Sequence, residues 1–393
     1  MTMAVQTPFY YYDLALLENT LQALNDAIPS SKFKVHYAVK ANAEDRILQT
    51  IQRYGLGADC VSGNEITKSI ACGFNPSEIV LAGVGKSDAE LHTAISNGIH
   101  SINCESIEEL EVINEIAEQN NRVANISFRI NPNVDAKTHH KITTGLSENK
   151  FGIPISEVSR AIAEIRKMEF LSLSGIHFHI GSQILSMDPF IKLCNQVNTL
   201  LDEIEGEGIQ LDHINVGGGL GIDYLNPDQN PIPDFEKYFA VFHEHLNVRD
   251  GQTVHFELGR SVVAQCGSLI TKVLYVKKGA TKNFAIVDAG MTELIRPALY
   301  DSYHEMENIT ADSLLGTDNY SVVGPICESS DVFGELEMPI TKRGDLIKIK
   351  SAGAYGQVLS SNYNLRDSAK AYYSDKNELT SWVGSEKKET SLT

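Results

Sequence analysis

Short apolar runs rich in β-branched residues alternate with helical patterns over much of this chain. Each run is bounded by polar residues or glycine, as is typical of buried parallel strands. Between the first two runs, Ile47, Leu48 and Ile51 recur at helical spacing, and IEELEVINEIAEQ repeats that pattern further on. The segments that we predict as strands are KVHYAVK, GADCVS, EIVLAG, SINCES, ISFRINP, GIHFHIGS, HINVGGG and VHFELGR.

Eight strand–helix alternations between about residues 34 and 260 predict an α/β fold of the (β/α)8 barrel type. The spacings leave room for the right-handed crossovers that parallel strands need. A doubly wound open sheet is the competing interpretation, and it would show fewer strands and a G-x-G-x-x-G motif after the first one. Here the first strand ends at Lys40 and the glycines follow the seventh strand.

The pattern changes after residue 266, where strands follow one another without intervening helices. SLITKVLYVKKG, NFAIVDAG, YSVVGPIC and DLIKIKSAGAYG predict a second, mainly β domain of sandwich or barrel type, to which PFYYYD could add a strand. We therefore expect a barrel domain at 30–266 and a β domain formed by 1–29 together with 267–393. Long segments at 133–153 and 221–233 interrupt the barrel, and 133–153 is the candidate to close over a substrate.

Composition narrows the classes of partner. The formal net charge of -18 argues against nucleic acid or an anionic membrane as the main partner, and no apolar run is long enough to span a membrane. The six cysteines are scattered without a CxxC pair, and the opening residues lack the features of a signal peptide. We expect reduced thiols, a cytoplasmic location and a small-molecule substrate. His177 and His179 share a strand face, but no third metal ligand has convincing spacing, so no metal is expected.

Chemically capable residues stand where the predicted strands end, which is where barrel enzymes carry their active sites. Glycines and an arginine after the seventh and eighth strands suit a phosphate, because glycine lets backbone N–H groups approach an anion. The residues that this rule gathers are Lys40, Asp59, Arg129, His179, Ser182, Gly217, Gly218, Gly219, Glu257, Gly259 and Arg260.

A phosphate site together with a lysine at a strand end indicates pyridoxal 5′-phosphate. The lysine amine would form a Schiff base with the aldehyde of the cofactor. Glu257 could pair with the pyridine nitrogen and keep it protonated, whereas racemases of this general class tend to use an arginine there. The glutamate therefore favours decarboxylation, and His179 could stack on one face of the ring.

These motifs resemble those of the barrel-type pyridoxal-phosphate decarboxylases that act on ornithine, arginine and diaminopimelate. The resemblance runs from TPFYYYD to SSNYN at 360–364. The chain departs from it at Leu258, which stands in the place of a proline, and after SSNYN, where NLRDSAKAYYSDKN replaces an arginine-proline and a basic closing strand. THHKITTGLSENKFGI, DAGMTELIRPALYDSYH and CES are most similar to the members that decarboxylate meso-2,6-diaminopimelate to L-lysine. The motifs that carry the resemblance are YAVKAN, HIGSQ, GGGLG, ELGRS, GPICESSD and GAYG.

The resemblance implies a set of roles. Lys40 would carry the cofactor, and Cys327 would donate a proton to the carbanion-like intermediate. Cys327 and Glu328 would come from the partner subunit, which implies a head-to-tail homodimer with shared active sites. The resemblance also implies a substrate-binding set that holds the carboxylates and the distal amino group, and Tyr355 in it would touch the cofactor as well: Arg260, Arg296, Tyr300, Glu328 and Tyr355.

The residues agree with this implication, since the far end of diaminopimelate carries both a carboxylate and an ammonium. Arg296 and Glu328 supply the two opposite charges that such an end needs. Three alternatives stay open: a decarboxylase of carboxynorspermidine, ornithine or arginine, an amino-acid racemase, and a non-catalytic relative that binds the cofactor. Glu257 argues against the racemase, and the presence of both Lys40 and Cys327 argues against a non-catalytic relative.

Overall fold

The computed structural model describes residues 5–134 and 150–375. The chain divides into two compact units, of which the first comprises Leu21–Gly221 and Pro233–Gly259. The second takes the described residues before Leu21, those from Ile222 to Ile232, and those from Arg260 onward. Within the described ranges, no helix is both long and apolar enough to cross a membrane.

The first unit is a closed barrel of parallel strands. Its strand order is β5-β4-β3-β2-β10-β9-β8-β6, and β5 also pairs with β6, so the ring has no open edge. This confirms the predicted (β/α)8 fold, with each predicted run forming one barrel strand. The barrel strands are β2 (Phe33–Ala38), β3 (Gly57–Cys60), β4 (Ile79–Leu81), β5 (Ser101–Cys104), β6 (Ala124–Asn131), β8 (Leu171–His177), β9 (His213–Asn215) and β10 (Thr253–Leu258).

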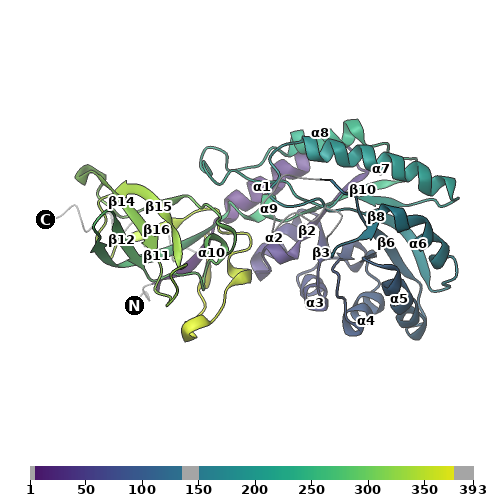
Figure 1. The fold of residues 1–393 in the computed structure, drawn as a ribbon, viewed down its shortest axis with the longest axis horizontal. Coiled ribbons are helices and arrows are strands. Elements are labelled where there is room, and N and C mark those ends of the chain that lie inside the picture. The colour runs from purple at the N-terminus through teal and green to yellow at the C-terminus, as the bar shows by residue number, and fades with distance from the viewer. Residues whose placement is uncertain (1–4, 135–149, 376–393) are drawn as a thin grey trace. The chain divides into compact units, whose positions relative to one another are not determined.

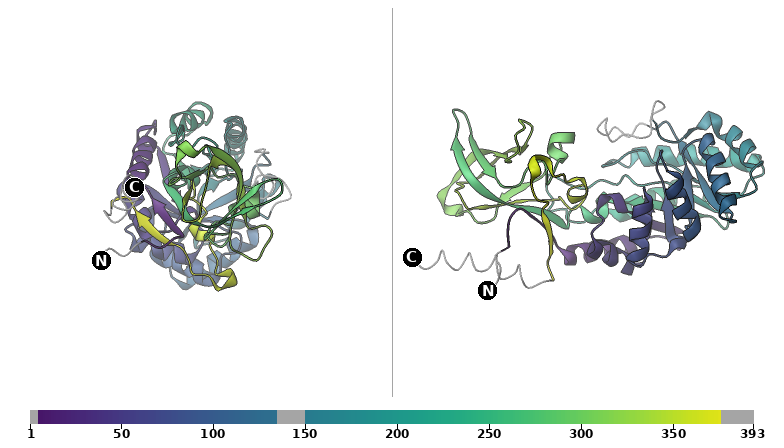
Figure 2. Two further views of the ribbon diagram at one scale, coloured as in Figure 1. Left: turned by 90° about the vertical axis from the view of Figure 1, so that its left-hand side faces the viewer. Right: turned by 90° about the horizontal axis from the view of Figure 1, so that it is seen from below.

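Helices lie outside the strands of this unit (Figure 1). In α5 the buried positions Leu110, Ile113 and Ala117 form the apolar stripe that faces the barrel, and Ser106 caps the first turn by accepting from Glu109 N. Figure 2 shows the same arrangement from two further directions. The barrel helices are α2 (Asp45–Arg53), α3 (Gly63–Ala71), α4 (Asp88–Asn97), α5 (Ile107–Gln119), α6 (Val158–Ile165), α7 (Asp188–Gly206) and α8 (Phe235–His245); α1 (Leu14–Asp26) begins in the second unit and ends in the first.

Histidines fill part of the barrel interior toward the amino ends of the strands. His36 contacts the Glu78 carbonyl oxygen through Nδ1 at 3.0 Å and His255 Nδ1 through Nε2 at 2.9 Å. His213 Nε2 lies 2.8 Å from the Ser127 hydroxyl. A half-buried His100 lies beside the rings of His213 and His255, with centroids 4.9 and 5.0 Å away. This group of four imidazoles is called the histidine layer below.

Two glycines make room for the histidine layer. A Cβ at Gly175 would lie 2.3 Å from His213 Nε2, and one at Gly57 would lie 2.5 Å from His36 Nδ1. Both approaches are shorter than any van der Waals contact, so the imidazoles occupy the volume that a side chain at either glycine would need.

The second unit is mainly β, as predicted. Its sheet has the order β13-β16-β11-β12-β14-β15, with β1 pairing with β11 and β17. Strands β13, β15 and β17 were not predicted. The strands are β1 (Phe9–Tyr12), β11 (Gly267–Lys278), β12 (Asn283–Val287), β13 (Met306–Asn308), β14 (Thr317–Val323), β15 (Val332–Pro339), β16 (Leu346–Ile349) and β17 (Lys370–Tyr373), and two short helices, α9 (Arg260–Val263) and α10 (Arg296–Tyr300), belong to the same unit.

The compact units and the predicted domains have different limits. The structure counts residues 222–232 and 260–266 with the second unit, and Leu21–Pro29 with the barrel. The division into a cofactor-binding domain at 30–266 and a β domain formed by the other residues stays a prediction. The segment 133–153, predicted to close over a substrate, lies largely outside the described residues.

Candidate active site

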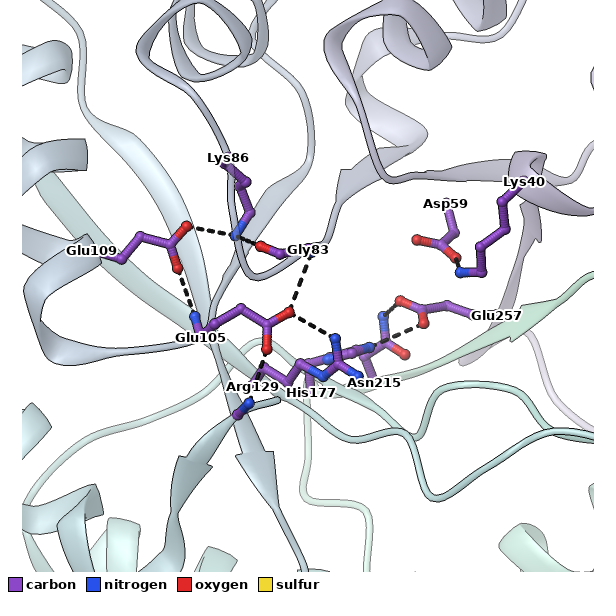
Figure 3. Close-up of polar contacts among 11 residues, drawn as sticks. Lys40, Asp59, Gly83, Lys86, Glu105, Glu109, Arg129, His177, Asn215 and Glu257 are labelled. Carbon is purple, nitrogen blue, oxygen red and sulfur yellow. Dashed lines mark hydrogen bonds and ion pairs between the residues drawn. The ribbon is translucent and has the colours of Figure 1, made fainter. Parts of the chain in front are cut away.

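Lys40 follows the end of β2 and pairs with an aspartate on the next strand. It sits in a single helical turn, Val39–Ala41, and its Nζ lies 2.9 Å from Asp59 Oδ2 on β3 (Figure 3). The Lys40 side chain is 39% exposed, whereas that of Asp59 is fully buried. Burial, reinforced by the charge of Glu257, raises the pKa of Asp59 to about 6 although Lys40 opposes the shift. The site thus offers a reachable amine beside a buried acid.

Glu257, on β10, is held by one donor at each carboxylate oxygen. His177 Nε2 lies 3.0 Å from Oε2, and Asn215 Nδ2 donates to Oε1 at 2.8 Å. Burial opposes the ionisation of Glu257. The charge and hydrogen bond of His177, aided by Lys40, outweigh burial and hold the Glu257 pKa well below its usual range. Figure 3 shows His177 and Asn215 beside Glu257. The structure therefore holds Glu257 as a buried carboxylate.

His179 and the three glycines form a tightly packed turn region. The Gly218 N–H donates to His179 Nδ1 at 3.3 Å, and burial, followed by the nearby charges of Arg129 and Lys40, lowers the His179 pKa to about 3. A Cβ at Gly217, Gly218 or Gly219 would lie only 2.2, 1.9 and 2.7 Å from a backbone oxygen. Only glycine fits here, and His179 offers a neutral ring.

Ser182 and Gly259 each follow a barrel strand. Ser182 is half-buried in the loop that follows β8. Gly259 follows β10 directly, and a Cβ there would lie 3.0 Å from the Cβ atoms of Ala38 and Ala41. The close approach at Gly259 brings the end of β10 against the turn that carries Lys40.

Arg129, on β6, is paired with a glutamate that the sequence patterns missed. Its Nη1 lies 2.7 Å from Glu105 Oε1, and both side chains are buried. Glu105 also accepts the N–H groups of Gly83 and Gly152 at 3.2 and 2.9 Å. Since Glu105 directly follows β5, the strand-end rule that selected the other residues could have found it.

A second buried group of charges lies within the second unit. Arg260 Nη1 donates to the Tyr224 hydroxyl at 2.6 Å, and its guanidinium carbon lies 4.9 Å from the centre of the Tyr355 ring. The guanidinium carbon of Arg296 lies 5.3 Å from the centre of the Tyr224 ring. Burial lowers the pKa of Arg296. At Arg260 burial also acts to lower the pKa, but Tyr224, Tyr355 and Tyr300 together outweigh it and raise the pKa. Tyr300, the last residue of α10, is half-buried.

Two residues of this second group were not singled out from the sequence. Tyr224 lies in the long 221–233 segment, and the guanidinium carbons of Arg260 and Arg296 lie 5.9 and 5.3 Å from the centre of its ring. His304 accepts from Arg296 Nε at 3.3 Å, and burial lowers the His304 pKa to about 3, so its ring is neutral. Tyr224 thus contacts both guanidinium groups and His304 accepts from Arg296, and a planar guanidinium suits bidentate binding of a carboxylate.

Cys327 and Glu328 stand on an exposed loop of the same unit. The Cys327 N–H donates to Asn364 Oδ1 at 3.2 Å, and the Tyr363 hydroxyl donates to Glu328 Oε1 at 2.7 Å. Asp331 holds the backbone next to this loop by accepting from Met291 N and Ile326 N at 2.6 and 2.7 Å. All six cysteines are free, and Cys327 alone among them is exposed. Its thiol is therefore open to another molecule or subunit.

Comparison with known proteins gives a consistent result. Residues 14–264 match the family model described as "Pyridoxal-dependent decarboxylase, pyridoxal binding domain". A diaminopimelate decarboxylase of Bacteroides thetaiotaomicron is 56% identical over 373 residues, which cover 94% of this chain and 96% of that protein. The crystal structure of diaminopimelate decarboxylase from Helicobacter pylori complexed with L-lysine is 40% identical, with a TM-score of 0.89, and covers 95% of this chain and 93% of that one.

Proposed function

This chain belongs to the pyridoxal-dependent decarboxylase family, and on that premise we propose that it decarboxylates meso-2,6-diaminopimelate to L-lysine, the last step of lysine biosynthesis. The resemblance, the lyase activity and the cofactor expected from the sequence are confirmed by the family match and by relatives of up to 56% identity over nearly the whole length. The residue roles that follow are part of the proposal.

The barrel residues fit pyridoxal phosphate. Asp59 Oδ1 is buried without a hydrogen-bond partner in the structure, a polar atom that a bound group could satisfy. The glycine turn at 217–219 admits no Cβ, so its backbone can approach a phosphate closely. Lys40 supplies the amine for covalent attachment, and Glu257 the carboxylate for the ring nitrogen. The rest of the proposed cofactor-binding set is His179, Arg129, Ser182, Gly259, Arg260 and Tyr355.

When bound, pyridoxal phosphate supplies an electron sink for the pair left on Cα after carbon dioxide departs. The protein supports this loss in three ways. Glu257 would stabilise positive charge at the ring nitrogen, neutral His179 would contact the ring without adding charge, and Lys40 would anchor the group at the end of β2.

The single observation that carries substrate choice is the pair of buried guanidiniums around Tyr224. Diaminopimelate has two carboxylates, and Arg260 and Arg296 each offer a planar donor fork for one. Tyr300 and Tyr355 contribute hydroxyl groups to the same set. Glu328 binds the distal ammonium, so Arg296 and Glu328 offer opposite charges to the carboxylate and the ammonium of the distal end.

Cys327 is the proton donor in this scheme. The bond between Cα and the carboxylate carbon breaks, its electron pair stays on Cα, and the Cys327 thiol gives its proton to Cα and recovers one from solvent. The exposure of Cys327 and the family resemblance support a homodimer in which this residue acts in the active site of the partner subunit. The free thiols support a cytoplasmic location.

The test is release of carbon dioxide by the cofactor-loaded protein from separate solutions of meso-diaminopimelate, ornithine, arginine and carboxynorspermidine. We expect release from diaminopimelate alone, with L-lysine as the product. Release only from another amine would keep the reaction type and overturn the roles given to Arg296 and Glu328. No release from any of the four would overturn the proposed activity.

A further inference from the structure

Glu257 is enclosed by two side chains that neither the sequence patterns nor the comparisons assign. His177, Asn215 and Glu257 are all buried, with 1%, 1% and 6% of each residue exposed. His177 Nε2 and Asn215 Nδ2 reach different oxygens of the carboxylate, at 3.0 and 2.8 Å. The two contacts form a clamp, here called the Glu257 clamp, that leaves little freedom for the carboxylate to rotate.

The orientation of the Asn215 amide is fixed from its other end. Asn215 Oδ1 accepts the Gly217 N–H at 2.9 Å, so the NH2 group must be the part that faces Glu257. The Glu257 N–H in turn donates to the Gly217 carbonyl at 2.9 Å. Asn215 therefore links the glycine turn to the carboxylate in a closed ring of three hydrogen bonds.

The clamp favours the ionised form of Glu257. The Asn215 NH2 group cannot accept a proton, and a His177 ring that carries a proton on Nε2 offers Glu257 a donor alone. Beside those two donors a protonated Glu257 would find no acceptor, and a carboxylate with a donor at each oxygen is favoured over the acid. The remaining lone pairs of Glu257 are then free to accept from a protonated ring nitrogen.

We propose that His177 and Asn215 are positioning residues that keep Glu257 ionised and aimed, and that Asn215 sets the distance between Glu257 and the glycine turn. This inference rests on the proposed function only in placing the cofactor ring at Glu257. The clamp itself is independent of which amino acid is decarboxylated.

The decisive variant is Asn215→Asp. It keeps an oxygen for Gly217 N–H but replaces the donor to Glu257 with a second acidic oxygen, so one of the two acids must take a proton. In cofactor-loaded protein without substrate, we expect the nitrogen-15 signal of ring-labelled pyridoxal phosphate to move from the protonated toward the unprotonated position. We also expect kcat to fall by about 10–100-fold, as for other supporting partners of a functional group, with KM for diaminopimelate nearly unchanged.

The chain offers a matched control in Asn198 on α7. Its Oδ1 accepts from Asn247 N at 2.8 Å and its Nδ2 donates to the His245 carbonyl at 2.8 Å, the same two-ended arrangement as that of Asn215. Asn198→Asp makes the same chemical change away from Glu257. It should leave both the ring-nitrogen signal and kcat at the values of the unaltered protein.

Variants at His177 give a second, independent measurement. His177→Gln can keep an N–H donor toward Glu257 and should retain most of the protonated signal, whereas His177→Leu should lose it. If both His177→Leu and Asn215→Asp keep the original ring-nitrogen signal, the clamp proposal is overturned. Because that signal is read without substrate, its result stands apart from the four-substrate test of the proposed function.

Discussion

The two ends of the barrel interior differ in the polar side chains that they bury, which are uncharged at the amino end and include charged groups at the carboxyl end. On β9 and β10, His213 lies two residues before Asn215 and His255 two residues before Glu257, so each pair points to the same side of its strand. At the amino end the partners of the histidine layer are uncharged: a carbonyl, hydroxyls and other imidazoles. At the carboxyl end Lys40, Asp59 and Glu257 bring charge into the interior.

The charged side chains described above thus lie at the carboxyl end of the barrel, where a bound ligand would pair with them. Burying an ion costs several kcal/mol unless it is paired and hydrogen-bonded, which makes a charged cluster a poor stabiliser of a barrel. Neutral imidazoles avoid the cost of burying an ion and can replace part of the usual aliphatic filling. The comparison predicts that changes at the carboxyl end act on turnover, and changes at the amino end on stability.

The largest expected effect is that of Lys40→Ala on turnover. Loss of the amine removes covalent attachment of the cofactor, so carbon dioxide release should fall by about a thousand-fold or more. Stability should change little, because the raised pKa of Asp59 lets that acid take a proton once its partner is gone. Carbon dioxide release and thermal unfolding measure the two quantities.

Lys34→Ala is the matched control, because Lys34 is an exposed residue near the amino end of the same strand, β2. It should leave turnover at the level of the unaltered protein. Near-normal release from Lys40→Ala would contradict both the assigned role and the contrast between the two barrel ends.

The next effect is on stability, through Gly175→Ala. The added methyl would lie 2.3 Å from His213 Nε2, and overpacking of this kind typically costs about 1–3 kcal/mol of unfolding free energy. Urea-induced unfolding measures the loss, while kcat of the folded fraction should be retained. Gly206→Ala on α7 is the control, since nothing lies within 4 Å of a Cβ there.

Removing the His213 imidazole tests whether its clash with a methyl at position 175 causes the loss of unfolding free energy. In a His213→Ala background the methyl at position 175 meets a cavity, so its added cost should largely disappear. If Gly175→Ala costs as much with His213 absent as with it present, the histidine layer is not what excludes a side chain at Gly175.

The sequence predicted the barrel well because its strands are buried on both faces and its helices carry regular apolar stripes. The second unit was harder: β13 has only three residues, and β15 alternates Glu335 and Glu337 with apolar positions, without the continuous apolar run that marked other strands. Short or charged edge segments take their structure from their neighbours in the sheet more than from local preference.

The residues missed at the site share one property, which is that they act through another residue. Glu105 matters here through Arg129, Asn215 through Glu257 and Tyr224 through two arginines. A motif shows which side chain stands at a strand end, but its hydrogen-bond partner is set by strand register and loop path. Those contacts form only when distant segments meet, so the linear pattern could not reveal them.

The smallest effect we predict is a change in the pH dependence of stability through His36→Gln. Burial, with the nearby charge of His100, lowers the His36 pKa to about 4, so folded His36 stays neutral while the unfolded chain takes up a proton below about pH 6.5. A base with a depressed pKa stabilises the fold fully above the unfolded value. That stability is lost as the pH falls toward the folded value, by roughly 1.4 kcal/mol per pH unit for one histidine.

The difference in unfolding free energy between the unaltered protein and His36→Gln isolates the contribution of His36. Asp59 and Glu65, with pKa values raised by burial to about 6 and about 7, act in the opposite direction, since they stabilise the fold at low pH and lose that effect as the pH rises. These acids are common to both proteins, so subtracting the two unfolding free energies at pH 7.5 and 5.5 cancels them. His36→Gln should lose less stability than the unaltered protein over that interval, because glutamine does not titrate. An equal loss in both would mean that His36 takes up a proton within the fold, and the amino end of the barrel would then tolerate charge as the carboxyl end does.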